Sequence, residues 1–416
     1  MTALLLAATL NAPSTARAAG GCFRVGTAPA GAARALVIAR PGASILRAIE
    51  TGTEDARGRV VLRPSLRRCM PTFWLERGPP PTLAVSGPGW DGTIRSSSTR
   101  IDGLVAASDV AAELRGEDVL HPHGHADVEA LAARIGRAKD ERVPARIALA
   151  AIVIGLLLVA PRRAVMAGAS AVAAALVLSA FDSTSVGLFA LLTLIGAFAP
   201  LELLWVFFAA YLVVLAVWPE TNSLAILGPH PGGGGRFHGM TNEVETLLLG
   251  PALLLGLAAA PLILVIVAWS RAGADGGGAL TYLAGYGMLL PRRRNAALLV
   301  YAAAMVAVGL ALVGIDAATG GHSHVTKTIG DGPDAVWHAF THRWSASWRG
   351  ATGNVWRVVL VVACLGGLVW VATSTPRHRL VDAFLVAIAV SLVVNDTPQD
   401  VLLWGSLQAL ALRRSL

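Results

Sequence analysis

Apolar residues are distributed very unevenly along this chain. From Val143 onward, nearly every segment between charged clusters is an uninterrupted run of Ala, Leu, Val and Ile, whereas the earlier part mixes polar and apolar positions. A bilayer requires each spanning segment to satisfy its own backbone groups, and helices do so naturally. The pattern therefore predicts a mainly α protein, in which a small α/β domain at residues 20–142 precedes a polytopic helical membrane bundle at residues 143–416.

The apolar runs predict about nine to eleven membrane spans. Pro200 and Pro261 fall between neighbouring runs, where breaks or tight turns are expected. The predicted spans cover residues 146–161, 164–181, 186–199, 201–218, 245–260, 262–271, 277–290, 296–314, 355–373, 380–394 and 399–412.

Residues 1–19 form a separate segment. Leu4–Leu10 is too short to span a membrane, and Ala16-Arg17-Ala18 resembles a signal-peptidase site. A signal peptide or a weak anchor is therefore predicted. If the following domain is exported, Cys22 and Cys69 can form a disulfide, the alternative being two unpaired thiols.

Composition and charge support a membrane protein. Hydrophobic residues make up 55% of the chain and charged residues 14%, with a net charge of +8. When residues 20–142 are placed outside the cytoplasm, four arginine clusters fall on the cytoplasmic side, as the positive-inside rule prefers. Membrane lipids explain this charge, and no nucleic-acid motif is present. The clusters are Arg162-Arg163, Arg292–Arg294, Arg377 with Arg379, and Arg413-Arg414.

The same topology places the polar motifs together on the extracytoplasmic side. The most informative is GPHPGGGGRFHGMTNEVE at residues 228–245. Arg236 supplies a planar fork suited to phosphate or carboxylate, and the preceding glycines can expose backbone N–H groups to the same anion. His238, Asn242 and Glu243 follow at the start of an apolar run. The simpler alternative is a flexible loop followed by a well-capped helix.

Three further motifs carry candidate site residues. Asp275 lies within GADGGG, Asn395 and Asp396 lie between two apolar runs, and Asp316 precedes a loop with His322 and His324. A histidine there can act as a general base. Asp275 can pair with Arg236 or hold a metal ion, and the simpler alternative is a turn-forming Asp that needs neither. The predicted catalytic residues are His322, His324 and Glu243. The predicted substrate-binding residues are Arg236, His238, Asn242, Asp275, Asp316, Asn395 and Asp396. The sequence identifies no metal ion or cofactor.

Two family resemblances follow from these motifs. Residues 80–116, with a GPG turn and the segment STRIDGLVAASD, resemble the closing part of an alkaline-phosphatase-superfamily domain. Such domains precede the bundle in a group of uncharacterised bacterial polytopic membrane proteins with motifs similar to GRFHGMTNE, GADGGG and VNDT. Here Arg40-Pro41 stands where that superfamily would have an Asp, and most of its metal-bearing middle is absent. The resemblance therefore implies a reduced domain without phosphatase chemistry.

The second resemblance is to O-antigen ligase and polymerase-like membrane glycosyltransferases, through Arg236, Gly239 and Asn242 followed by a histidine-bearing loop. Those proteins move glycans from a polyprenyl diphosphate. The resemblance implies an extracytoplasmic-facing transferase of the cell envelope, acting on a lipid-linked, phosphate-bearing glycan. Two alternatives remain open: a transporter or flippase of an anionic envelope precursor, and a non-enzymatic membrane scaffold, whose motifs need not converge in space.

Overall fold

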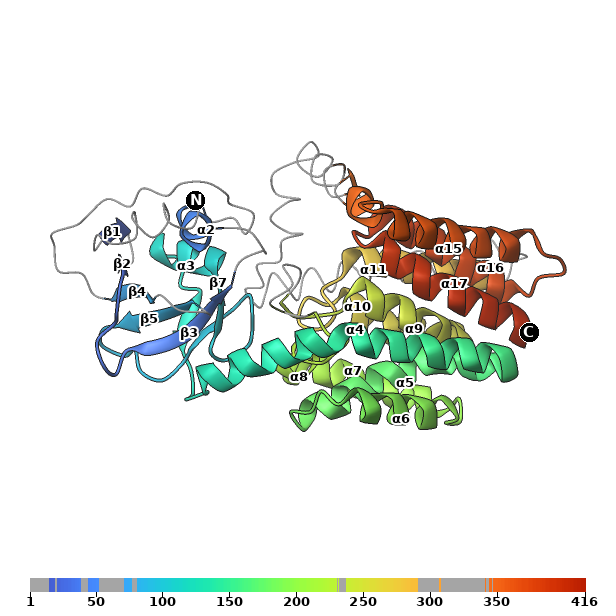
Figure 1. Ribbon diagram of the computed structural model, residues 1–416, viewed down its shortest axis with the longest axis horizontal. Coiled ribbons are helices and arrows are strands. Elements are labelled where there is room, and N and C mark those ends of the chain that lie inside the picture. Colours follow the sequence, from blue (N-terminus) through green and yellow to red (C-terminus); the bar gives the residue numbers. More distant parts are fainter. Residues whose placement is uncertain are drawn as a thin grey trace. The chain divides into compact units, whose positions relative to one another are not determined.

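The computed structural model describes residues 15–18, 21–38, 44–51, 71–76, 81–229, 237–290 and 347–416, together with positions 231, 307, 341, 344 and 345. The chain divides into two compact units. The first comprises Met1–Asp140 with Pro229–His238, and the second comprises Glu141–Gly228 with Gly239–Leu416. The protein is mainly helical with a small sheet region, as the sequence predicts (Figure 1).

Within the described part of the first unit, a mixed six-stranded sheet has the order β1-β2-β4-β5-β3-β7. β2 is parallel to β4 and β3 is parallel to β7, while the other neighbours are antiparallel. The strands are β1 (Thr15–Ala18), β2 (Gly21–Val25), β3 (Ala33–Ile38), β4 (Thr72–Glu76), β5 (Thr82–Ser86) and β7 (Leu104–Ala106). A separate antiparallel pair joins β6 (Ile94–Ser96) to β8 (Leu120–Pro122).

One face of this sheet packs against helices. In β4, Phe73 and Leu75 are buried, whereas Thr72, Trp74 and Glu76 are only partly buried, because successive side chains of a strand point to opposite faces. Phe73 and Leu75 belong to a core that includes residues of α2 (Ile45–Thr51) and α3 (Ala107–Leu114). Asp109 caps α3, since its Oδ2 accepts a hydrogen bond from the Ala106 amide at 3.1 Å.

The start of the chain contains one element that the sequence analysis did not predict. β1, Thr15–Ala18, lies within the predicted signal segment and pairs with β2. Residues 1–14 and Cys69 lie outside the described residues, as does the side chain of Cys22. The signal peptide and the disulfide therefore stay predictions.

The second unit is built of helices, whose positions match most of the predicted spans to within a few residues. They are α4 (Val128–Val159), which belongs to this unit from Glu141 onward, α5 (Pro161–Ala180), α6 (Val186–Ala197), α7 (Leu203–Val217), α8 (Pro219–Ser223), α9 (Asn242–Leu254), η2 (Leu257–Ala259), α10 (Ala260–Ala268), α11 (Gly276–Leu289), α15 (Val355–Thr373), α16 (Arg379–Val394) and α17 (Pro398–Ser415). α4 starts well before the predicted residue 146 and continues through Pro144. The predicted span 296–314 lies outside the described residues.

Three of the described helices, α4, α5 and α15, are long and apolar enough to cross a membrane. α6 and α7 are shorter apolar helices that expose large apolar side chains, including Leu191, Ile195 and Val206. Extensive apolar exposure is unfavourable in water and is typical of a surface that contacts lipid or a partner. The predicted number of spans stays a prediction.

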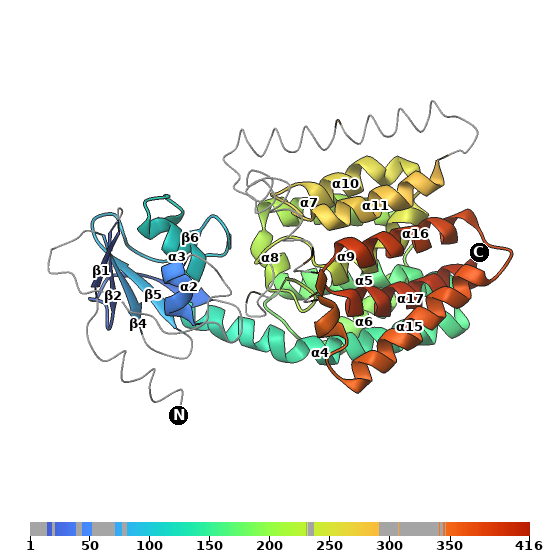
Figure 2. The same ribbon diagram turned by 90° about the horizontal axis from the view of Figure 1, so that it is seen from above.

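α9 lies at the centre of the second unit and packs against α5, α10, α11, α16 and α17 (Figure 2). Every residue from Asn242 to Leu253 is buried. Small residues on α5 permit this close approach: a Cβ on Gly168 would lie 2.2 Å from the Leu247 carbonyl oxygen. Glycine, which has no side chain, is therefore the residue that fits at this helix crossing.

Pro251 interrupts the hydrogen-bond ladder of α9, because proline has no N–H to donate to the Leu247 carbonyl four residues earlier. Gln408 of α17 compensates for this. Its Nε2 donates to the Leu247 oxygen at 2.9 Å and to the Thr246 oxygen at 3.1 Å, while its Oε1 accepts from the Gly250 amide at 3.1 Å. A single buried amide thus joins α17 to α9.

Candidate functional site

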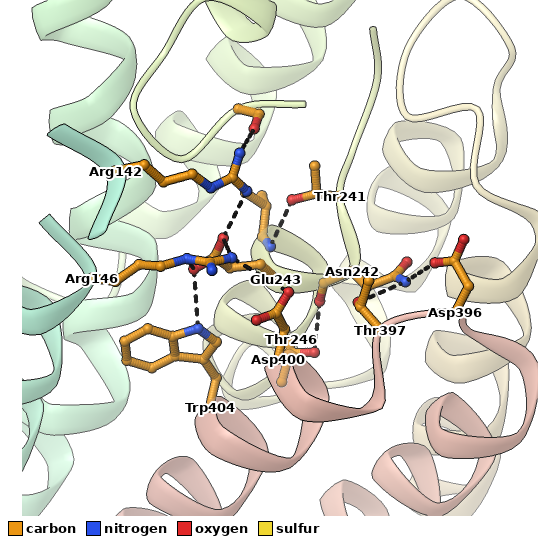
Figure 3. A network of polar contacts seen from close by, with 12 residues as sticks. Arg142, Arg146, Thr241, Asn242, Glu243, Thr246, Asp396, Thr397, Asp400 and Trp404 are labelled. Carbon is orange, nitrogen blue, oxygen red and sulfur yellow. Dashed lines mark hydrogen bonds and ion pairs between the residues drawn. The ribbon is translucent and has the colours of Figure 1, made fainter. Parts of the chain in front are cut away.

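Glu243 belongs to a charged cluster with Arg142, Arg146 and Asp400 (Figure 3). α9 begins after Thr241, whose Oγ1 accepts a hydrogen bond from the Val244 amide at 3.2 Å, and this cap directs Glu243 toward α4. Glu243 Oε1 accepts from Arg146 Nε at 2.6 Å and from Trp404 Nε1 at 3.2 Å. Its Oε2 accepts from Arg142 Nη2 at 3.1 Å and from Arg146 Nη2.

Asp400 completes this cluster, with its Oδ2 3.3 Å from Arg146 Nη2. Two guanidinium groups therefore face two carboxylates, so their formal charges cancel. The Glu243 side chain is only 1% exposed, and both of its oxygens already accept hydrogen bonds. A buried charge is tolerated only when it is paired in this way. The cluster ties α4, α9 and α17 together, while the catalytic role of Glu243 stays a prediction.

Asn242 connects two of the predicted motifs directly. Its Nδ2 donates to Asp396 Oδ1 at 2.7 Å and to Thr397 Oγ1 at 3.0 Å, as Figure 3 shows. Asn242 is buried, whereas Asp396 is exposed at the start of α17. An amide held in place by helix α9 thus orients a carboxylate that solvent can reach.

The neighbouring residue Asn395 makes a parallel connection. Its Nδ2 donates to Glu245 Oε2 at 2.9 Å and to Ser391 Oγ at 2.8 Å, and all three side chains are buried. Tyr282 of α11 donates to the Glu245 backbone oxygen at 2.9 Å. The Glu245 carboxylate is therefore held by the residue that follows α16, and its backbone carbonyl is held by α11.

Asp275 caps α11, and its Oδ1 accepts from the Gly278 amide at 3.1 Å. Gly277 and Gly278 are explained by close neighbours: a Cβ on Gly277 would lie 2.3 Å from Asn395 Oδ1, and one on Gly278 would lie 3.1 Å from Glu245 Oε2. Larger side chains would separate α11 from these groups. Asp275 is itself buried, at 1% exposure.

Gly239 joins the glycine-rich motif to the same region. It has φ +88, and a Cβ there would lie 2.3 Å from the Gly273 carbonyl oxygen. The Met240 amide donates to that oxygen at 2.9 Å. Residues of three predicted motifs, GRFHGMTNE, GADGGG and VNDT, therefore meet where α9, α11 and α17 begin and α16 ends.

The other predicted site residues lie either in the first unit or outside the described residues. His238 belongs to the first unit, where its Nδ1 lies 2.9 Å from the Ser98 carbonyl oxygen. Arg236, Asp316, His322 and His324 lie outside the described residues. Within the part of the chain that the structure describes, no three His, Cys, Asp or Glu side chains gather in a way that would hold a metal ion.

Several residues of this region were not predicted from the sequence: Arg142, Arg146, Asp400, Trp404 and Gln408. One signal pointed to Arg146, which lies inside the apolar run that starts at Val143. A charged residue there requires an internal partner. The identity of that partner, Glu243, could not be read from local sequence because 97 positions separate the two residues.

Comparison with known proteins identifies no relative: no family model matches the chain, and neither a curated protein nor a solved structure is significantly similar to it.

Proposed function

We propose that this chain is a multi-pass membrane protein of the bacterial cell envelope, and that it is an extracytoplasmic-facing transferase acting on a lipid-linked, phosphate-bearing glycan. The observation that carries the proposal is the convergence of three separate polar motifs around Asn242, Asp396 and Glu245. A scaffold has no need of such convergence. The alkaline-phosphatase-like and ligase-like resemblances supply the envelope context.

The distribution of charge along individual helices supports the proposed membrane placement. α16 begins at Arg379 and is followed by Asn395 and Asp396. α17 has Asp400 in its first turn and Arg413 and Arg414 in its last turn. Basic residues therefore lie at one end of each helix and the candidate site residues at the other. This arrangement agrees with basic residues in the cytoplasm and a site at the outer surface.

The proposed membrane orientation has a direct test. Thr184, between α5 and α6, and Thr375, between α15 and α16, lie in turns predicted on opposite sides. In a chain without its native cysteines, Thr184→Cys should react with an impermeant thiol reagent in intact cells. Thr375→Cys should react only after permeabilisation. The reverse labelling pattern would contradict the orientation.

Asp396 is the described residue best suited to activate an acceptor. General-base catalysis requires a carboxylate within reach of the hydroxyl that loses its proton, and Asp396 is exposed while Asn242 fixes one of its oxygens. In the proposed step, an acceptor hydroxyl oxygen bonds to the anomeric carbon of the donor glycan. The bond from that carbon to the diphosphate breaks, polyprenyl diphosphate leaves with the electron pair, and Asp396 takes the hydroxyl proton.

The other predicted residues keep complementary roles in this proposal. Arg236 would bind the diphosphate through its guanidinium fork, and His322 or His324 is the alternative base. Glu243 acts through the position of α9, because its oxygens are engaged by Arg142, Arg146 and Trp404.

The transfer assay uses the full chain in detergent, a polyprenyl-diphosphate-linked oligosaccharide and an acceptor glycan, with released polyprenyl diphosphate as the product measured. Asp396→Asn keeps an oxygen that can accept from Asn242 but removes the base, so we expect a loss of roughly 100-fold or more. Asp382→Asn is the matched control, since Asp382 lies in the first turn of α16 and pairs with Arg377 at 2.7 Å. Full activity of Asp396→Asn would refute the assigned base.

A transporter or flippase is the second candidate, and the buried Glu245–Asn395 contact favours it. Ionisable groups inside a helical membrane bundle commonly mark ion or proton pathways. Proteoliposomes separate the two functions. Movement of the lipid-linked glycan across the bilayer without release of polyprenyl diphosphate would support transport and contradict the transferase.

A further inference from the structure

The chain leaves the second unit after Gly228 and re-enters it at Gly239. The residues in between carry the glycine-rich motif of the sequence. We propose that Arg142 is a positioning residue that holds the two ends of this segment together, with Asn222 as a second, independent attachment. The inference rests on the proposed function for its catalytic consequence, but its structural basis lies wholly in the second unit.

Arg142 contacts both ends of the segment at once. Its Nη1 donates to the Gly228 carbonyl oxygen at 3.1 Å, and its Nη2 donates to Glu243 Oε2 at 3.1 Å. The guanidinium is planar, so its two terminal nitrogens present donors in a fixed relation to each other. The Arg142 side chain is 18% exposed, which limits competition from water. One side chain of α4 thus bridges the residue before the segment and the first turn of α9.

Asn222 makes the second attachment. Its Nδ2 donates to the Gly239 carbonyl oxygen at 2.7 Å, and its Oδ1 lies 3.3 Å from the Tyr211 hydroxyl, which donates to it. Gly228 packs directly on the backbone of Asn222, where a Cβ would lie 1.9 Å from the Asn222 carbonyl oxygen. The contacts of Asn222 therefore also reach both ends of the segment.

Fixed ends have a functional consequence under the proposed mechanism. A substrate-binding group must be held close to its productive position, because small displacements lower catalytic efficiency strongly. Gly239 is followed within a few residues by Asn242, which orients Asp396. Arg142 would therefore act on the proposed base through the first turn of α9, without touching the substrate.

The test measures hydrogen exchange in the full-length protein in lipid nanodiscs. In Arg142→Met, amides of Gly228 and Met240 should exchange roughly tenfold to 100-fold faster than in the wild type, because a lost charge-assisted hydrogen bond favours local opening. In Arg142→Lys, whose side chain ends in one compact ammonium, these exchange rates should lie between those of the wild type and those of Arg142→Met. Arg163→Met is the control: Arg163 donates to the Ala199 carbonyl oxygen at 2.9 Å at another turn, so exchange at Gly228 should not change.

A second variant makes the result independent of the folding of Arg142→Met. Asn222→Leu removes the amide contact to Gly239 at nearly constant volume, and it should accelerate exchange at Met240 by roughly tenfold. Wild-type exchange rates in Arg142→Lys and Asn222→Leu would overturn the inference.

The transfer assay then separates this inference from the proposed function. Loss of positioning predicts that Arg142→Lys raises KM for the polyprenyl-diphosphate donor about tenfold with less change in kcat. Faster exchange with unchanged transfer would support Arg142 as the attachment of the segment but contradict the catalytic importance of the segment. Unchanged exchange would reject the attachment itself, whatever the activity.

Discussion

Gln408 gives the sharpest test of how the second unit is held together. Replacement by Leu keeps a side chain of similar size but removes the donors to the Thr246 and Leu247 carbonyl oxygens and the acceptor for the Gly250 amide. The Leu247 oxygen is the critical atom, because Pro251 cannot supply the usual helical N–H. Without Gln408, this oxygen is left unsatisfied in a buried helix.

The expected decrease in the free energy of unfolding follows from these contacts. Interhelical hydrogen bonds in membrane proteins average about 0.6 kcal/mol each. An orphaned buried carbonyl adds about 1 kcal/mol or more. We therefore expect Gln408→Leu to lower the free energy of unfolding by about 2–3 kcal/mol. Gln399→Leu is the control in the same helix, since Gln399 Oε1 accepts no hydrogen bond from the described residues.

A double-mutant cycle with Pro251→Ala isolates the cause. Alanine restores an N–H that can donate to the Leu247 oxygen, so Gln408→Leu should cost about 1 kcal/mol less in the Pro251→Ala background. Unfolding in mixed micelles, followed by tryptophan fluorescence, measures all four proteins. A cost for Gln408→Leu no larger than that of Gln399→Leu, or no coupling in the cycle, would refute the reasoning.

Three further predictions concern the contacts of α9. Gly168→Ala should lower the thermal midpoint, because its Cβ would lie 2.2 Å from the Leu247 oxygen, and strain of this kind costs about 1–3 kcal/mol. Asn242→Asp should destabilise the protein by about 1 kcal/mol or more by placing two carboxylates together, and adding Asp396→Asn should restore stability by recreating the pair in reverse. Glu243→Ala should cost about 2–4 kcal/mol in the unfolding assay, because two guanidinium groups lose their shared acceptor.

Local sequence predicted the helices of the second unit well, because the longer helices of that unit coincide with apolar runs bounded by polar or proline-containing turns. It also led us to expect that the polar motifs would share one side. The pairing of Asn242 with Asp396 could not be derived, since 154 positions separate them and helix packing alone decides which residues meet.

Glu243 shows more clearly why local sequence could not predict the contacts of this site. At the start of an apolar run, a carboxylate is equally compatible with a helix cap, a substrate contact or a catalytic group. Its partners Arg142 and Arg146 come from α4, which begins at Val128, well before the predicted span at residues 146–161. The glycines of GADGGG were likewise noticed as a motif, but the reason for Gly277 and Gly278, close contact with Asn395 and Glu245, is purely tertiary.

The burial of α9 also determines when this protein can mature during its synthesis. Asn242, Glu243, Glu245 and the break at Pro251 make α9 a poor candidate for independent lipid insertion. Trp404 and Gln408, which complete its contacts, are translated more than 150 residues later, as the separation of 161 positions between Gln408 and Leu247 shows. In a nascent chain that lacks α17, Glu243 and the Leu247 carbonyl oxygen therefore lack these hydrogen-bond donors. We expect quality-control proteases to recognise that intermediate until α17 docks.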